Sequence, residues 1–176
     1  MRHTHYDEVA LARFFFSNTK VAALWLVVRL YVGWEWLAAG WSKMHNPLWW
    51  GNEAGGALTG FIQGALTKTT GVHPDVPMWY ANFLQNYVLP NVVTWSNAVA
   101  LGELLVGIAL IIGFLVGISA FFGAFMNFNY LLAGTVSMNP TFFLLGVLLI
   151  LAWRISGYLG VDYYILPRIH HLLKRN

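Results

Sequence analysis

The sequence predicts an all-α integral membrane protein that folds as a four-helix transmembrane bundle. Hydrophobic residues make up 58% of the 176-residue chain and charged residues only 10%, whereas a soluble domain carries about 25% charged residues. Four apolar stretches approach the 20 or so residues that a helix needs to cross a bilayer. Aromatic residues make up 16%, and their rings collect at the headgroup level. At this length we expect a single domain over residues 1–176.

The four predicted spans cover residues 21–41, 95–115, 116–136 and 141–163. The second and third abut at Gly113 and Gly117, which predicts a tight hairpin. Asn139 and Pro140 break the chain before the fourth span, because proline after asparagine is typical of a turn. At the end of the fourth span, Asp162 is expected to have a structural role, paired with Arg168 or a loop amide.

A long connection, residues 44–94, joins the first two spans. Connections of this length are usually functional or disordered, and the aromatic residues of this one give it enough apolar surface to fold. Two stretches, Ala57–Leu66 and Pro77–Leu89, are predicted as short interfacial helices on the outer membrane surface. They act either as a lid over a site or as a passive anchor, since amphipathic aromatic helices do both.

The positions of the basic residues predict the orientation. Six of the ten Lys and Arg residues lie before the first span or after the fourth. Between the first two spans, at residues 42–94, the chain holds only Lys43 and Lys68. Because cytoplasmic segments carry the excess of Lys and Arg, we expect a multi-pass protein of the cytoplasmic membrane, with both termini in the cytoplasm and the long loop outside. The basic residues do not cluster among aromatics, so no nucleic-acid partner is expected.

Four ionisable side chains are predicted near mid-depth in the spans: Arg29, Glu35, Glu103 and Arg154. Such residues are costly in lipid and usually mark a function. Counting 1.5 Å per residue from the span ends places the two Glu in the outer half and the two Arg just below the midplane. This arrangement, here called the charged column, would be neutral overall. The alternative is that these groups only join helices, at about 0.6 kcal/mol per interhelical hydrogen bond.

The residue types in the charged column indicate anion binding and proton transfer. Arginine binds oxyanions through a bidentate fork, and a carboxylate in apolar surroundings can take up and release protons. Asn127 and Tyr130 in the third span and Trp36 in the first add hydrogen-bonding and stacking groups. This combination suits redox exchange with a quinone. Haem is not expected, because the six His lie outside the spans, and the absence of Cys leaves no iron–sulfur ligands. We expect no metal.

Five segments from residue 29 onward carry a family resemblance: RLYVGWEWLAAGWSKMHNP (29–47), PMWYANFLQNYVLPN (77–91), GELLVGIALIIG (102–113), NFNYLLAGTVSMNP (127–140) and AWRISGYLGVDYYILP (152–167). They resemble the DoxX/DoxD family, specifically its DoxD branch, the membrane subunit of thiosulfate:quinone oxidoreductase. The resemblance implies a four-helix membrane bundle that oxidises thiosulfate to tetrathionate and passes electrons to a membrane quinone. Such bundles often work with a small extracytoplasmic DoxA-type subunit.

The resemblance and the charged column together imply roles for the ionisable residues. Thiosulfate enters from the outside and is held by Arg29, Lys43 and Arg154, while Glu35 and Glu103 handle the protons. Removing the charge of Arg29 or of Arg154 would then stop quinone reduction and leave the protein folded.

The remaining candidate residues are assigned to the quinone. The ring is expected to lie against Trp36, Trp41 and Tyr130. Asn127 and Asn129 would hydrogen-bond the quinone carbonyl or the sulfur oxyanion. The alternative function is a non-catalytic membrane scaffold or a small transporter that partners a periplasmic redox protein. Homo-oligomerisation is left open, because the glycine-rich faces allow close packing within or between chains.

Overall fold

The computed structural model describes residues 10–173, with side chains through residue 169, and this part of the chain contains helices and no strand. Three of the basic residues used above to predict orientation, Arg2, Lys174 and Arg175, lie outside the described residues. The main helices are α1 (Ala10–Ser17), α2 (Ala22–Met44), α3 (Gly56–Leu66), α4 (Met78–Phe83), α5 (Val92–Ile112), α6 (Val116–Leu132), α7 (Asn139–Leu151), α8 (Trp153–Ser156) and α9 (Asp162–Leu173).

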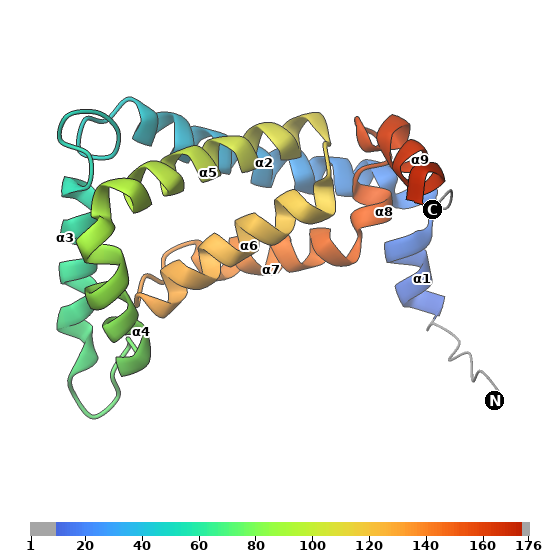
Figure 1. Ribbon diagram of the computed structural model, residues 1–176. Coiled ribbons are helices and arrows are strands. Elements are labelled where there is room, and N and C mark those ends of the chain that lie inside the picture. The colour runs from blue at the N-terminus through green and yellow to red at the C-terminus, as the bar shows by residue number, and fades with distance from the viewer. Residues whose placement is uncertain (1–9, 174–176) are drawn as a thin grey trace.

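The helices form an elongated molecule with two different ends (Figure 1). Helix α2 packs along α5, and α6 packs along α7. Helices α3 and α4 lie across one end, and α1, α8 and α9 gather at the other. We call these the α3–α4 end and the α8–α9 end. The chain is thus folded so that its two terminal helices lie together, far from the long connection.

Within residues 10–173, two helical segments have the length and composition needed to cross a bilayer, Thr19–Met44 and Met78–Ile112. Helices α6 and α7 are apolar but shorter, at 17 and 13 residues. The first and third predicted spans correspond to α2 and α6. The prediction of one continuous helix over residues 141–163 was wrong, because α7 ends at Leu151 and the separate α8 and a turn follow.

The second span begins much earlier than predicted. From Met78 the helical segment runs through α4, a π-helical stretch (Leu84–Val88) and a 3₁₀ stretch (Leu89–Asn91) into α5. Pro90 lies in the 3₁₀ stretch, and proline and π-bulges are the usual causes of a helix bend. Figure 1 shows the resulting change of direction between α4 and α5. The stretch expected as a separate surface helix is therefore the first part of the segment that leads into α5.

Helices α2 and α5 approach closely because two glycines face the opposite backbone. A Cβ atom on Gly40 of α2 would overlap the backbone of Leu104, and one on Gly107 of α5 would overlap the backbone of Leu37. Only a residue without a side chain fits at either position. Small residues allow this kind of contact between membrane helices, where dispersion contacts stabilise the pair.

Gly107→Ala is expected to lower the free energy of unfolding by at least about 2 kcal/mol, because overpacking a tight contact forces backbone shifts. The matched control is Gly102→Ala on the same helix, where an added Cβ would make an ordinary contact at 3.6 Å from the Met126 sulfur. The control should be neutral or slightly stabilising, since alanine favours helix over glycine. Thermal unfolding in detergent micelles, followed by circular dichroism, measures both. Equal effects would contradict the close α2–α5 contact.

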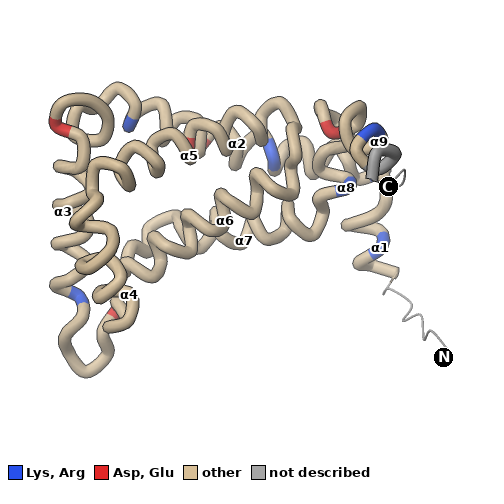
Figure 2. Tube along the Cα trace, in the orientation of Figure 1, with Lys and Arg blue, Asp and Glu red and all other residues tan. Residues whose placement is uncertain are grey.

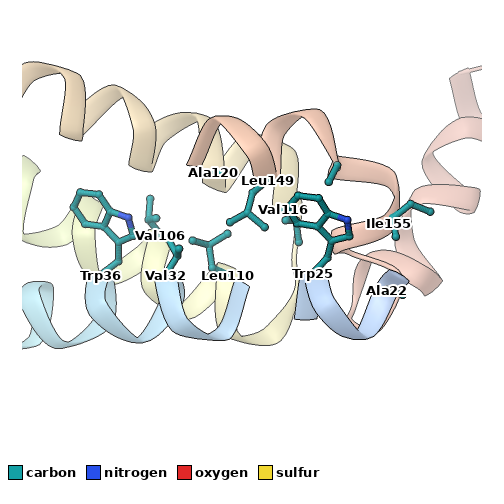
Figure 3. Packing of buried hydrophobic residues seen from close by; sticks show 11 residues of the cluster. Ala22, Trp25, Val32, Trp36, Val106, Leu110, Val116, Ala120, Leu149 and Ile155 are labelled. Carbon is teal, nitrogen blue, oxygen red and sulfur yellow. The ribbon is translucent and has the colours of Figure 1, made fainter. Parts of the chain in front are cut away.

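The hydrophobic core has two parts. The first lies between α2, α5, α6 and α7, where Trp36, Val32, Val106 and Leu110 interdigitate (Figure 3). The second lies at the α3–α4 end, and its fully buried members include Ile62 and Val76. Burying a large aliphatic side chain contributes roughly 1.5–3 kcal/mol. The long connection therefore has a core of its own, which also takes in the end of α6.

Candidate functional site

The most distinctive polar group in the interior is the carboxylate of Glu103 on α5. Its side chain is 1% exposed, and both of its oxygens are occupied. The Lys43 ammonium lies 2.5 Å from Oε2, and the Tyr130 hydroxyl donates to Oε1, also at 2.5 Å. Lys43 is the more accessible partner, with 19% of its side chain exposed. The three residues come from α2, α5 and α6, so the carboxylate connects three helices.

The glycine contact explains why Lys43 and Glu103 meet. Gly40 presses against the backbone around Glu103 and Leu104. Lys43 lies three residues after Gly40, so it occupies the same face of α2 one turn later. The contact therefore brings the ammonium to the carboxylate. An ion pair is what a low-dielectric interior requires, since an unpaired buried charge is strongly destabilising.

Asn127 on α6 provides a hydrogen-bond donor that has no partner among the described residues. The residue is 2% exposed, and its Nδ2 atom is buried. Asn127 precedes Tyr130 by three positions and follows Gly123, which contacts Trp36, by four. The three residues Gly123, Asn127 and Tyr130 therefore share one face of α6. We call Lys43, Glu103, Asn127 and Tyr130 the Glu103 cluster. A buried donor left unpaired costs roughly 1–3 kcal/mol, so this amide is the atom of the cluster that is best placed to take a ligand.

The long connection covers the Glu103 cluster. The ring of Trp49 lies 5.0 Å from the Lys43 ammonium, and the backbone carbonyl of Trp49 accepts a hydrogen bond from Ser96 at 2.7 Å. Phe61 of α3 packs edge-on against Tyr130, with ring centroids 6.0 Å apart. The connection therefore touches the site at two points. Whether the connection acts as a lid or as a passive anchor stays a prediction.

Asn129 has a different surrounding from Asn127. Its Oδ1 accepts from the Tyr80 hydroxyl at 3.1 Å, and its Nδ2 donates to the Phe125 carbonyl at 2.8 Å. Tyr80 also donates to the backbone carbonyl of Asn129 at 3.1 Å. The Oδ1 bond thus joins α4 to α6, whereas the Nδ2 bond stays within α6. Asn129 lies beside the cluster, and each polar atom of its amide already makes one hydrogen bond.

Arg29 forms a second buried polar centre, at the α8–α9 end. Its side chain is 1% exposed and donates to the backbone carbonyls of Ser156 and Leu159 at 2.9 and 3.0 Å. Close by, the Asp162 carboxylate accepts from the backbone amides of Leu115 and Val116 at 2.6 and 2.9 Å. Asp162 therefore caps the start of α6, as expected for a pairing with loop amides. The carbonyls of Ser156 and Leu159 are directed toward Arg29, so they are used by a side chain at the point where α8 ends.

The charged column does not form. Arg154 and Glu35 are both exposed on the protein surface, and Arg154 lies over the ring of Trp153 at 5.1 Å. Arg29 and Lys43 are 14 residues apart on α2, which is about 21 Å along the helix axis. The two buried polar centres thus lie near opposite ends of α2. Counting residues from the span ends predicts the depth of a side chain along the helix axis. It does not predict the direction in which the side chain points around that axis.

The two candidate tryptophans differ in burial. Trp36 is 6% exposed and packs against α6 at Gly123, next to the Glu103 cluster. Trp41 is 60% exposed and its ring stacks near His45, so it lies on the outer surface of α2. Two participants were missed as site residues, Trp49 and Tyr80, because the sequence showed them only as aromatic members of a long loop.

Comparison with known families supports the membrane assignment. A DoxX family model matches residues 24–136, a range that holds all four residues of the Glu103 cluster and stops short of Arg154 and Asp162. Comparison with curated proteins and with solved structures finds no match. The apolar helices and the family match together indicate a membrane protein. Because the match covers more than half of the 176 residues, the chain belongs to the DoxX family.

Proposed function

We propose that this protein is a DoxD-type membrane subunit that oxidises thiosulfate to tetrathionate and passes the electrons to a membrane quinone. The observation that carries the proposal is the Glu103 cluster: a buried carboxylate held between an ammonium and a phenol, beside an amide donor without a partner. The resemblance of the GWSK and AGT-x-S-x-NP segments to DoxD proteins supplies the reaction class. No metal or haem is required by this scheme.

The reaction balances with two substrates. Two thiosulfate ions join through a new S–S bond, which gives tetrathionate and releases two electrons. The quinone takes up these two electrons and two protons and leaves as the quinol. The protein's part is to bind both substrates and to deliver protons, because the redox chemistry belongs to the substrates themselves.

The cluster provides a short proton path. Tyr130, Glu103 and Lys43 form a continuous chain of hydrogen bonds from α6 to the partly exposed end of α2. A quinone carbonyl that accepts from Asn127 Nδ2 would lie beside Tyr130, because these residues share a helix face. Trp36 would border the ring on the α2 side. A positioned acid of this kind typically contributes about 10²–10⁴-fold to the rate.

Lys43 is the cationic residue of the cluster and takes over the anion-binding role that was expected for three residues. Its ammonium is reachable from the long connection and is shielded on one side by Trp49. When Glu103 takes up a proton, its charge no longer neutralises Lys43, and the ammonium can then bind an oxyanion. Anion binding and proton uptake are coupled in this way at one carboxylate.

The direct test uses purified wild-type protein with thiosulfate and a short-chain quinone analogue, with and without a DoxA-type partner. Thiosulfate-dependent loss of the oxidised quinone absorbance, with one tetrathionate formed per quinol, is the expected result. Asn127→Leu should raise the KM for the quinone about tenfold, as the loss of one hydrogen bond predicts. Asn97→Leu, which alters another amide with a buried unpartnered atom, is the matched control and should leave KM unchanged. No turnover with or without the partner would refute the proposal.

A second candidate function is a non-catalytic scaffold for a periplasmic redox protein. The observation that favours it is the exposed aromatic surface at the α3–α4 end, where Trp79 and Tyr87 are 62% and 67% exposed. Large exposed aromatic patches often mark partner or membrane contacts. The same assay distinguishes the two functions, because a scaffold is silent in it and should instead retain a periplasmic partner on co-purification.

A further inference from the structure

A wholly apolar groove lies at the α8–α9 end, between α1, α2 and α7. Its volume is about 520 Å³, and its lining includes Leu11, Phe15, Leu24, Trp25, Leu145 and Leu148. The indole N–H of Trp25 does not face it as a free donor, since it donates to the Phe15 carbonyl at 2.7 Å. The groove thus offers no hydrogen bond to a ligand. Its chemistry fits a hydrocarbon chain.

Helix α1 forms one wall of this groove and has the character of an interfacial helix. Leu11 and Phe14 are 67% and 44% exposed, and Arg13 lies between them. The hydrogen bond from Trp25 and the packing of Phe16 on the Trp25 ring, with centroids 5.7 Å apart, hold α1 against α2. Helices with one apolar and one basic face rest at the boundary between headgroups and acyl chains.

Exposed basic residues lie on the segments that form the groove. Arg13 is on α1, which forms one wall, and Lys20 lies in the turn that joins α1 to α2. Arg154 is exposed on α8, which contacts α1. Among the described residues the carboxylate at this end is Asp162, which is buried and accepts two backbone amides. Figure 2 shows basic positions on α1 and α8 at this end. The described charged side chains on α1, on α8 and in the turn between α1 and α2 are therefore basic, and we call them the basic rim.

We propose that this groove binds an anionic phospholipid, with one acyl chain between α1, α2 and α7 and the phosphate at Arg13 and Lys20. The apolar lining selects the chain, and the basic rim selects an anionic headgroup over a zwitterionic one. Basic pockets between membrane helices hold anionic lipids through the same combination of contacts. The site is separate from the Glu103 cluster, which lies toward the opposite end of α2, so it does not depend on the proposed redox function.

The test is native mass spectrometry of the full-length protein in detergent, titrated with phosphatidylglycerol or phosphatidylcholine that carry identical oleoyl chains. The first phosphatidylglycerol should bind at least about tenfold more tightly than the first phosphatidylcholine. Removing two charges in Arg13→Gln/Lys20→Gln should weaken phosphatidylglycerol binding roughly 30-fold and leave phosphatidylcholine binding unchanged. Arg168→Gln, which removes a basic residue from α9, a helix that does not line the groove, is the matched control and should have no effect.

A second pair of variants tests the acyl chain. Leu24→Trp fills the groove and should weaken binding of both lipids at least about tenfold. Val27→Trp on the same helix changes an exposed residue outside the lining and should leave both unchanged. Circular dichroism of each variant checks that the fold is retained. Equal affinity for the two lipids, equal losses in variant and control, or displacement of phosphatidylglycerol by a long-tailed quinone would each overturn the assignment.

Discussion

Glu103→Gln is expected to lower the kcat of thiosulfate-dependent quinone reduction by at least about 100-fold. Glutamine keeps the shape of the side chain but has one acceptor oxygen, so it can accept from Tyr130 or from Lys43 and not from both through separate oxygens. It cannot take up or release a proton at neutral pH. The interaction with the ammonium of Lys43 also becomes weaker, so the coupling between anion binding and protonation is lost. Steady-state kinetics with a short-chain quinone and thiosulfate measure the change.

The matched control is Glu35→Gln, which changes a carboxylate on the same membrane-spanning helix as Lys43 but on the exposed surface. It should leave kcat within about twofold of the wild type. Because breaking a buried ion pair can itself destabilise the protein, the double variant Lys43→Met/Glu103→Gln provides a second, charge-balanced background in which activity should also be lost. Full activity in Glu103→Gln would exclude the carboxylate from the proton path.

Arg29→Met is expected to lower the free energy of unfolding by about 3–5 kcal/mol, the range for removing one partner from a buried charged network. The variant loses hydrogen bonds to the carbonyls of Ser156 and Leu159. It also leaves the nearby Asp162 without a balancing charge in the interior. Thermal unfolding in detergent micelles should therefore show a clear loss for this variant.

Arg154→Met serves as the control for Arg29→Met, because Arg154 is exposed and its described contact is the ring of Trp153. Its effect should stay within about 0.5 kcal/mol, as for other surface substitutions. The sequence had placed the two arginines in one anion site with equal roles. An Arg29→Met protein with unchanged thermal stability but no quinone reduction would restore that anion site and contradict the structural role of Arg29.

These expectations separate the molecule into two functional ends. The Glu103 cluster, with Trp49 and Phe61 of the long connection beside it, carries the proposed chemistry. Arg29 and Asp162 hold the α8–α9 end together, where the proposed lipid site lies. A variant that affects turnover without stability should therefore map to the first end, and one that affects lipid binding to the second.

Much of the architecture could be read from composition and local pattern. The long apolar runs predict α2 and α6 closely, and Pro77 marks the start of α4, because these signals depend on neighbouring residues in the chain. The same holds for singling out Arg29 and Glu103, since a charge within an apolar run must have a partner. A pairing of Asp162 with loop amides was one of the two alternatives predicted from its position at the end of the fourth span.

The partners of those charges depended on contacts between distant segments. Lys43 meets Glu103 because Gly40 lets two backbones touch, and Arg29 meets the α8 turn because Gly113 and Gly160 leave room for its guanidinium. Residue counting gives depth along a helix, whereas pairing depends on rotation about the axis, and a shift of one residue turns a side chain by about 100°. For this reason Glu35 and Arg154 face outward although their depths were suitable. The end of α8 also involves a distant segment, since the carbonyl of Ser156 accepts from a side chain 127 residues away.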